Sequence, residues 1–305
     1  MINFSFTLFF FIFFYILNKK IIFKDKIIEI QKGENIENIL KNKTINLKDS
    51  DITFINFYFK FNNIYSSKHI HYGEFYINES LSSINLLKII SKPSNILNKL
   101  SIIEGWSKNE FNFEIKKHFS KSFDVPFEDI IADTYFYQKN QDFELFIEKL
   151  KKLKKMHFSK YKNNEILNKF TINEIMIIGS LIEKEGLDIN DKKKISSVIF
   201  NRLNQGMKLQ IDATVLFSIT DGRYNLNRKL LLSDLKFKHP YNTYLNKGLP
   251  PKPISYVGKK TIDLIFENNK TDFLFYFFDK SLNKHVFSKN YEEHKQKLKK
   301  YRNEK

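Results

Sequence analysis

TINEIMIIGSLIEKEG, residues 171–186, has the clearest folding signal in this chain. Thr171 is followed three residues later by Glu174 and then by an apolar run, which is the pattern of a capping box at a helix N-terminus. Gly186 stands where such a helix would end, because glycine commonly follows the last helical turn. The stretch therefore predicts a helix over residues 172–185.

Two glutamates, Glu183 and Glu185, lie near the end of this predicted helix. Residues two apart are rotated by about 200° around a helix axis, so the two side chains have different surroundings. Glu185 follows Ile178, Leu181 and Ile182 at helical spacing and continues their apolar stripe. We therefore predict that Glu185 is the glutamate on the buried side.

A carboxyl group held against apolar walls is suited to acid chemistry. Burial disfavours its ionised form and raises its pKa, so that it can protonate a leaving group near neutral pH. The alternative is that Glu185 lies in a frayed last turn, contacts water and has no chemical role. The pattern of this helix alone leaves both interpretations open.

Three segments downstream add polar groups to this helix. DKKKISSVIFNRLNQGM (191–207) predicts a second helix, which closes at Gly206. KLQIDATVLFSI (208–219) alternates polar and apolar residues, which predicts that Gln210, Asp212 and Thr214 share one face. YNTYLNKGLPPKPIS (241–255) is a proline-stiffened loop rich in amide, hydroxyl and aromatic groups. Such a loop would suit a sugar polymer, and an ordinary structural loop explains its composition equally well.

The N-terminal part predicts an anchor and a small module. An uncharged apolar run extends from Phe4 to Leu17, at the short edge of a membrane span, and no basic region precedes it as in a cleaved signal peptide. We expect an uncleaved single-span anchor over residues 1–19, with a buried core strand as the alternative. Lys19 and Lys20 follow the run, and by the positive-inside rule they would argue for a cytoplasmic body. Strand and helix patterns over residues 20–100 predict a small α+β module.

Composition narrows the chemistry. The chain has 305 residues and a net charge of +17, which suggests nucleic acid or an anionic membrane as a partner. Lysine, asparagine, isoleucine and phenylalanine are abundant throughout, however, as codon usage in an AT-rich genome would produce. The absence of cysteine excludes disulfides, thiolate metal sites and a cysteine nucleophile. No glycine-rich phosphate loop, internal repeat or metal-spaced histidine cluster occurs, so we predict no cofactor and no metal.

These segments together resemble the MltG (YceG-like) family of membrane-anchored endolytic murein transglycosylases. The resemblance rests on EGW (104–106), IEKEG (182–186), VIFNRLNQGMKLQIDATV (198–215), YNTYLNKGLPPKPIS (241–255) and FLFYFFDKSLNKHVFSKNYEEH (273–294). It covers nearly the whole chain. It implies an α+β fold in three parts: a transmembrane anchor at 1–19, a LysM-like α+β subdomain at 20–100 and an α+β transglycosylase catalytic domain at 101–305.

The activity implied by the resemblance is non-hydrolytic cleavage of the β-1,4 bond between N-acetylmuramic acid and N-acetylglucosamine within a peptidoglycan strand. The family's catalytic glutamate falls on Glu185. It protonates the glycosidic oxygen and then, as a carboxylate, takes the proton of the muramic C6 hydroxyl, which leaves a 1,6-anhydro end without metal or cofactor. By similarity, the residues that line the cleft and orient sugar and acid are Asn201, Arg202, Gln210, Asp212, Thr214, Tyr241, Asn242, Thr243 and Tyr244.

Some positions keep a second interpretation or depart from the family pattern. Asn201 and Arg202 could equally tie the second helix to the following strand. For His285 and His294, packing or a surface position is a better explanation than catalysis. The departures are Gly186 where the family commonly has Thr or Ser, Ile211 for Thr, Ala213 for Pro, and Glu128, Asp129 and Ala132 in EDIIADTYFY (128–137).

The resemblance implies peptidoglycan strands, the inner membrane and cell-wall synthases as partners, and no nucleic acid. It also implies a single-pass protein of the cell inner membrane with a periplasmic catalytic domain. The first alternative function is a non-catalytic peptidoglycan-binding or scaffold protein of cell-wall synthesis. The second, a basic binder of membrane surfaces or nucleic acid, predicts strongly salt-dependent binding to polyanions.

Overall fold

The structure, a computed structural model, describes residues 11, 13–66, 69–77, 80–120, 122–224 and 226–303. It divides into two compact units, one formed by Met1–Lys99 with Phe136–Phe146 and the other by Leu100–Tyr135 with Ile147–Lys305. Among the described residues the strands form two-stranded sheets, and helices make up most of the rest. The α+β class predicted from the sequence is confirmed.

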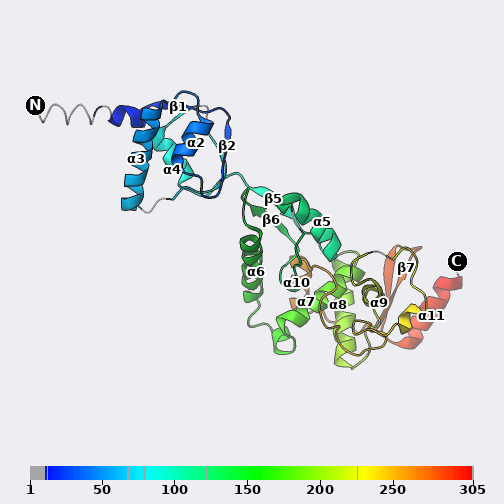
Figure 1. Cartoon of the computed structure of the whole chain (residues 1–305). Coiled ribbons are helices and arrows are strands. Elements are labelled where there is room, and N and C mark those ends of the chain that lie inside the picture. The colour runs from blue at the N-terminus through cyan, green and yellow to red at the C-terminus, as the bar shows by residue number, and fades with distance from the viewer. Residues whose placement is uncertain are drawn as a thin grey trace, which may run out of the picture. The chain divides into compact units, whose positions relative to one another are not determined.

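The first unit packs its helices against two antiparallel sheets (Figure 1). Its elements are β1 (Lys20–Ile22), β2 (Ile27–Ile30), α2 (Ile36–Lys43), α3 (Asp49–Ser66), β3 (Gly73–Tyr76), β4 (Ser80–Ser82) and α4 (Ser83–Ile90). β1 pairs with β4, and β2 pairs with β3. Because strand side chains alternate between faces, Ile28 and Ile30 both point into a core that also contains Ile39 and Leu86.

Most of the predicted anchor falls outside the described residues. Residues 13–18 are helical, and Ile16 packs into the core of the first unit. Phe14 and Tyr15 of the same turn are exposed. In the part of the chain that the structure describes, no helix combines the length and the apolar character needed to cross a membrane. An anchor over residues 1–19 therefore stays a prediction.

The second unit is mainly helical (Figure 1). Strands β5 (Asn98–Ser101) and β6 (Thr134–Tyr137) pair with each other and, like the helix over Phe143–Ser159, have residues assigned to both units. The antiparallel strands β7 (Phe275–Asp279) and β8 (Lys284–Ser288) form another pair, which contacts the last helix. The helices are α5 (Lys108–Phe119), α6 (Phe143–Ser159), η1 (Glu165–Asn168), α7 (Ile172–Glu185), α8 (Ile189–Asn204), α9 (Asp212–Thr220), η2 (Asp234–Lys236), α10 (Lys259–Phe266) and α11 (Tyr291–Asn303).

Helix α7 lies at the centre of the second unit and contacts α8, α9 and α10. Its N-terminus carries the predicted capping box: the Thr171 hydroxyl accepts the N–H of Glu174, and the Glu174 carboxylate accepts the N–H of Thr171. Residues 175–182 are all buried. Gly179 lets Val257 approach the helix closely, because a Cβ at this position would collide with the Val257 side chain. The predicted helix and its cap are confirmed.

The alternation of polar and apolar residues over 208–219 does not mark a strand, because Asp212–Thr220 form helix α9. Gln210 has a φ of 53°, which ends the extended segment before the helix. Thr214 and Ser218 donate their hydroxyl groups to the carbonyls of Ile211 and Thr214, so polar residues are satisfied on buried faces of the helix. The prediction that Gln210, Asp212 and Thr214 share one face is therefore wrong.

Candidate active site

Glu183 is a structural glutamate at the end of α7. Its carboxylate is paired with Lys192 of α8 and accepts the backbone N–H of Gly258 at 3.0 Å. Lys192 also donates to the Thr261 hydroxyl at 3.2 Å, so this pair joins α7, α8 and the start of α10. The Glu183 side chain is only 2% exposed, which corrects the prediction that Glu185 alone lies on the buried side. Near the end of the helix both flanks are covered.

Glu185 is half-buried among polar groups that differ in kind from those around Glu183. The Tyr276 hydroxyl donates to its Oε2 at 3.3 Å. Burial raises the pKa of the Glu185 carboxyl, and the negative charge of Asp212 raises it further. His285, Tyr276 and the backbone N–H of Ala213 act in the opposite direction but do not cancel these effects. The carboxyl group thus keeps its proton to higher pH than an ordinary glutamate, as a general acid requires.

Strands β7 and β8 supply residues to this site that sequence reasoning missed or placed elsewhere. Tyr276 lies within an aromatic strand, FLFYFFD, and its hydroxyl is the one weak signal of a polar role. Its ring meets the His285 ring edge-on at 5.4 Å between centroids. His285 is buried and its Nδ1 lies 2.8 Å from the Asp191 carboxylate, so its packing role includes a place beside Glu185. His294 packs against Phe275.

Asp212 and Tyr244 were both predicted site residues, and the structure brings them together. The Tyr244 hydroxyl donates to Asp212 Oδ1 at 2.6 Å. Burial raises the pKa of Tyr244, and so does its bond to Asp212. Asp212 is exposed in the first turn of α9, where the positive end of the helix dipole favours a carboxylate. The carboxylate of Asp212 therefore provides a negative charge near Glu185 at the exposed start of α9.

Three other predicted residues, Thr214, Asn242 and Thr243, are fully buried. The hydroxyls of Thr214 and Thr243 lie 2.8 Å apart, and Thr243 accepts the N–H of Ile211 at 3.0 Å. The Asn242 amide donates to the carbonyls of Leu235 and Phe237. The sequence had predicted that these residues line the cleft. Because their polar groups are satisfied inside the protein, they instead shape the walls of the site from within.

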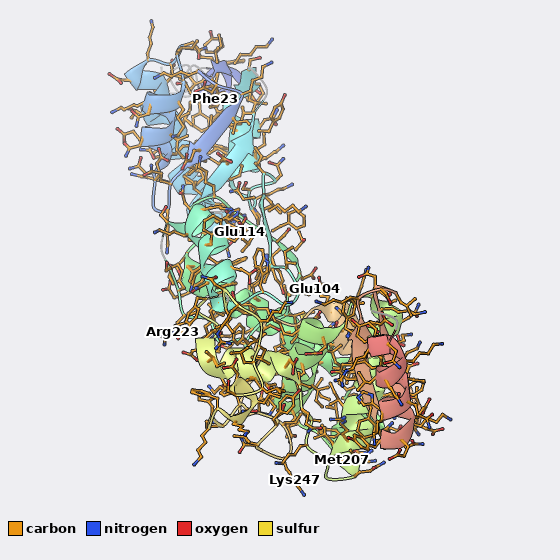
Figure 2. All side chains as sticks on the ribbon, turned by 90° about the vertical axis from the view of Figure 1, so that its right-hand side faces the viewer. Phe23, Glu104, Glu114, Met207, Arg223 and Lys247 are labelled. Atoms are coloured by element: carbon orange, nitrogen blue, oxygen red, sulfur yellow. The ribbon has the colours of Figure 1, made fainter. Side chains whose placement is uncertain are left out.

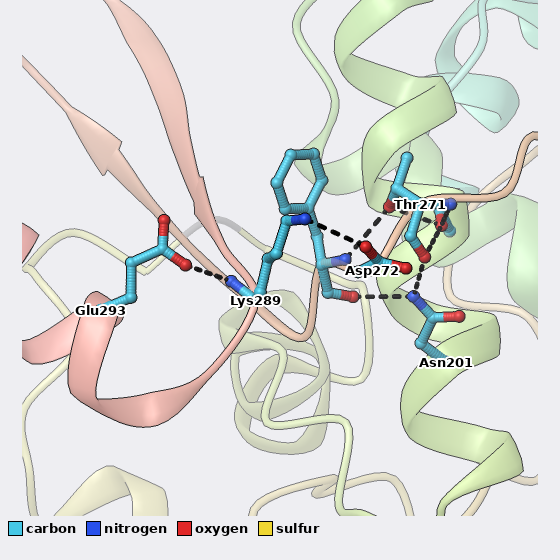
Figure 3. Close-up of polar contacts among 7 residues, drawn as sticks. Asn201, Thr271, Asp272, Lys289 and Glu293 are labelled. Carbon is cyan, nitrogen blue, oxygen red and sulfur yellow. Dashed lines mark hydrogen bonds and ion pairs between the residues drawn. The ribbon is translucent and has the colours of Figure 1, made fainter.

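Asn201 and Arg202 make contacts of the structural kind, which support their second interpretation, and their place in the cleft stays a prediction. Asn201 donates to the carbonyls of Thr271 at 2.7 Å and Phe273 at 2.9 Å, and Figure 3 shows this side chain reaching from α8 to the segment before β7. Arg202 donates to the carbonyl of Leu274 at 2.6 Å and, in a longer hydrogen bond of 3.3 Å, to Gln210 Oε1. Both side chains therefore hold β7, and with it Tyr276, against α8. Gln210 is exposed.

A cleft of about 450 Å³ opens beside Asp212. Its walls include Lys184, which precedes Glu185 in the sequence, Ala213 of α9, and Arg223, which follows the end of α9 (Figure 2). A second hollow of about 460 Å³ shares Arg223 with the cleft and extends to Tyr241. The cleft and the second hollow also share Asn109 and Phe217, so they adjoin. Among the described residues, no group of three or more His, Asp or Glu side chains is arranged to hold a metal ion.

One of the departures from the family pattern has a local explanation. A Cβ at Gly186 would collide with the Lys192 side chain, so glycine makes room for the Glu183–Lys192 pair. Ala213 is buried in the first turn of α9. Ile211 is buried and caps α9 without a side-chain hydrogen bond.

Comparison with known proteins gives one family. Residues 28–300 match the model of the YceG-like family. An endolytic murein transglycosylase of Bacillus subtilis is 35% identical over 185 residues, which are 60% of this chain and 50% of the relative. One of Streptococcus pneumoniae is 30% identical over 164 residues, 53% of this chain and 29% of the relative. The matched regions thus span half or less of these relatives. The crystal structure of a YceG-like protein of Listeria monocytogenes has a TM-score of 0.56 and 25% identity, covering 88% of this chain and 97% of that one.

Proposed function

Because the chain belongs to the YceG-like family, we propose that it is an endolytic murein transglycosylase that cuts the β-1,4 bond between N-acetylmuramic acid and N-acetylglucosamine. Relatives that bear the name endolytic murein transglycosylase support the reaction class. The observation that carries the proposal is the position of Glu185, whose half-buried carboxyl group lies beside the open cleft. Burial and the charge of Asp212 both raise the pKa of this carboxyl group.

Glu185 first acts as an acid. Its proton goes to the glycosidic oxygen, the bond from this oxygen to C1 of the muramic residue breaks, and the leaving sugar departs with a hydroxyl. Positive charge then develops at C1, as in other glycosidic cleavages. Asp212, held by Tyr244 and exposed at the cleft, is placed to stabilise that charge.

Glu185 then acts as a base. The C6 hydroxyl of the muramic residue attacks C1 and gives its proton to the Glu185 carboxylate. A C1–O6 bond replaces the broken bond, which yields a 1,6-anhydro end and restores the protonated acid. No water is consumed, so one carboxyl group that changes its role is sufficient, unlike the two-carboxylate arrangement of most glycosidases.

The reaction is tested by mass spectrometry of the products formed from purified peptidoglycan strands. Wild-type protein should give 1,6-anhydro-muramic ends, and Glu185→Gln should give none. The exposed Glu292→Gln serves as a matched control and should behave as the wild type does. Reducing ends would mean hydrolysis. Binding of strands without any products would favour the peptidoglycan-binding or scaffold function.

We also propose that the protein is anchored once in the inner membrane with its catalytic unit in the periplasm, where nascent strands and their synthases lie. The apolar run from Phe4 to Leu17 supports this location. Protease added to right-side-out and inverted vesicles should digest the catalytic unit from the periplasmic side. Digestion from the cytoplasmic side would exclude the cell-wall function.

A further inference from the structure

A neutral hydrogen-bond donor from a distant part of the chain meets the carboxyl group of Glu185. The Tyr276 hydroxyl, from β7, donates to Oε2 at 3.3 Å. The tyrosine has no charge, so it favours a carboxylate without fixing it permanently in the ionised form. Glu183 is different, because its carboxylate is paired with a lysine.

Tyr276 is itself held by a chain of contacts that returns to α7. Its ring packs against His285 and Phe287, with centroid distances of 5.4 and 5.8 Å. His285 Nδ1 is bonded to Asp191 at 2.8 Å, with both side chains about nine-tenths buried or more. Asp191 also accepts the N–H of Leu187 at 3.0 Å, two residues beyond Glu185. The hydroxyl position is therefore set by residues outside the cleft.

Donors of this kind matter in the second half of the proposed reaction. After the proton has left, Glu185 must exist as a carboxylate in surroundings where burial and Asp212 oppose that form. The Tyr276 hydroxyl supplies stabilisation at that moment. The Tyr276 bond is longer than the usual 2.5–3.0 Å for two oxygens, and catalytic bonds commonly tighten once substrate is bound. Because Oε2 accepts from Tyr276, the transferable proton belongs on Oε1.

We propose that Tyr276 is a positioning residue that orients Glu185 and stabilises its carboxylate, with His285 and Asp191 fixing Tyr276. The role of this arrangement in turnover rests on the proposed transglycosylase function. Its effect on the carboxyl group does not, because that effect is present without substrate.

The test removes the donor and keeps its ring. Tyr276→Phe deletes the hydroxyl and keeps the ring that packs on His285. The matched control is Tyr161→Phe, which deletes a hydroxyl bonded at 2.5 Å to another carboxylate, that of Asp263. Each protein is titrated by carbon NMR of the Glu185 carboxyl, without substrate, and assayed for kcat and KM.

Tyr276→Phe should raise the pKa of Glu185 above its wild-type value, since the variant loses a donor that favours the carboxylate. The other groups around the carboxyl, Asp212, Tyr244, His285 and Arg202, remain in place. We expect kcat to fall by about tenfold or more, in the range of positioned donors to developing charge, with KM little changed. Tyr161→Phe should change neither quantity.

An unchanged Glu185 titration and an unchanged kcat in Tyr276→Phe would overturn the proposal. If Tyr276→Phe does not fold, Tyr276→3-fluorotyrosine decides, because it keeps the ring and makes the hydroxyl a stronger donor: the pKa of Glu185 should fall, and an unchanged titration would overturn the proposal. A shifted titration in a protein whose wild type releases no anhydro ends would instead show that Tyr276 acts on Glu185 while the proposed function is wrong.

Discussion

Glu183 and Lys192 form an ion pair that joins α7 to α8, and the next glutamate in the chain, Glu185, accepts its hydrogen bond from a neutral tyrosine. Two carboxyl groups in one helical turn are therefore used differently. The first is neutralised by a fixed cation, and the second is left free to exchange its proton.

Glu183→Gln should destabilise the fold. Lys192 would keep its partly buried ammonium group without a carboxylate, and the cost of losing one partner of a buried pair predicts a loss of about 2–3 kcal/mol. Urea unfolding of the variant and the wild type measures this loss. The folded fraction should still cut strands at close to the wild-type rate, because Glu183 has no part in the chemistry. A stable but inactive variant would contradict this division of roles.

Glu185→Gln should be inactive and yet more stable than the wild type at neutral pH. The pKa of Glu185 is raised in the folded state, so its folded form is favoured at low pH and loses stability as pH rises through the folded pKa. Glutamine has no charge to bury. The difference in Tm between variant and wild type should therefore be smallest below about pH 4 and grow as pH rises. A constant difference would mean that the carboxyl is not perturbed.

Asp212→Asn should shift the pH dependence of cleavage downwards. Asp212 raises the pKa of Glu185, so its removal lowers that pKa and the acid loses its proton at lower pH. The alkaline limb of the kcat/KM profile should move to lower pH, and kcat should also fall because a charge facing the cleft is lost. Tyr244→Phe, which frees Asp212 without removing its charge, should leave the alkaline limb closer to that of the wild type.

Gly186→Ser should weaken the same contacts as Glu183→Gln. The added Cβ would collide with the Lys192 side chain and displace it, at a cost of about 1–3 kcal/mol typical of overpacking. Because both changes disturb one ion pair, the double variant should lose less stability than the sum of the single variants. Additive losses in a thermal or urea unfolding cycle would show that Gly186 acts independently of Lys192.

The helix α7, its capping box and the importance of its last glutamates could be read from the sequence, because caps and helical periodicity are local properties. The prediction of a shared polar face over 208–219 was wrong for the opposite reason, because it depends on tertiary packing. Helix α9 is buried on several sides, so its helical period is hidden in the sequence. Hydroxyl groups that bond to the previous turn also occupy its buried faces.

Part of the site was equally beyond local reading. Tyr276 is one tyrosine in an aromatic strand, and its role at the site depends on a hydrogen bond to Glu185, which lies 91 positions away in the sequence. The buried state of Asn242 and Thr243 likewise comes from partners in other segments. The sequence pattern identified a polar loop correctly, but it could not distinguish groups that face the cleft from groups that hold its walls.

The distance along the chain between Glu185 and its tyrosine also sets an order in time. Helix α7 leaves the ribosome long before β7, and the Asp191–His285 contact spans 94 positions in the same way. A growing polypeptide therefore contains the acid without the groups that aim it. Such a nascent chain should pass through synthesis with its cutting chemistry unassembled, and gain it when the β7–β8 hairpin docks.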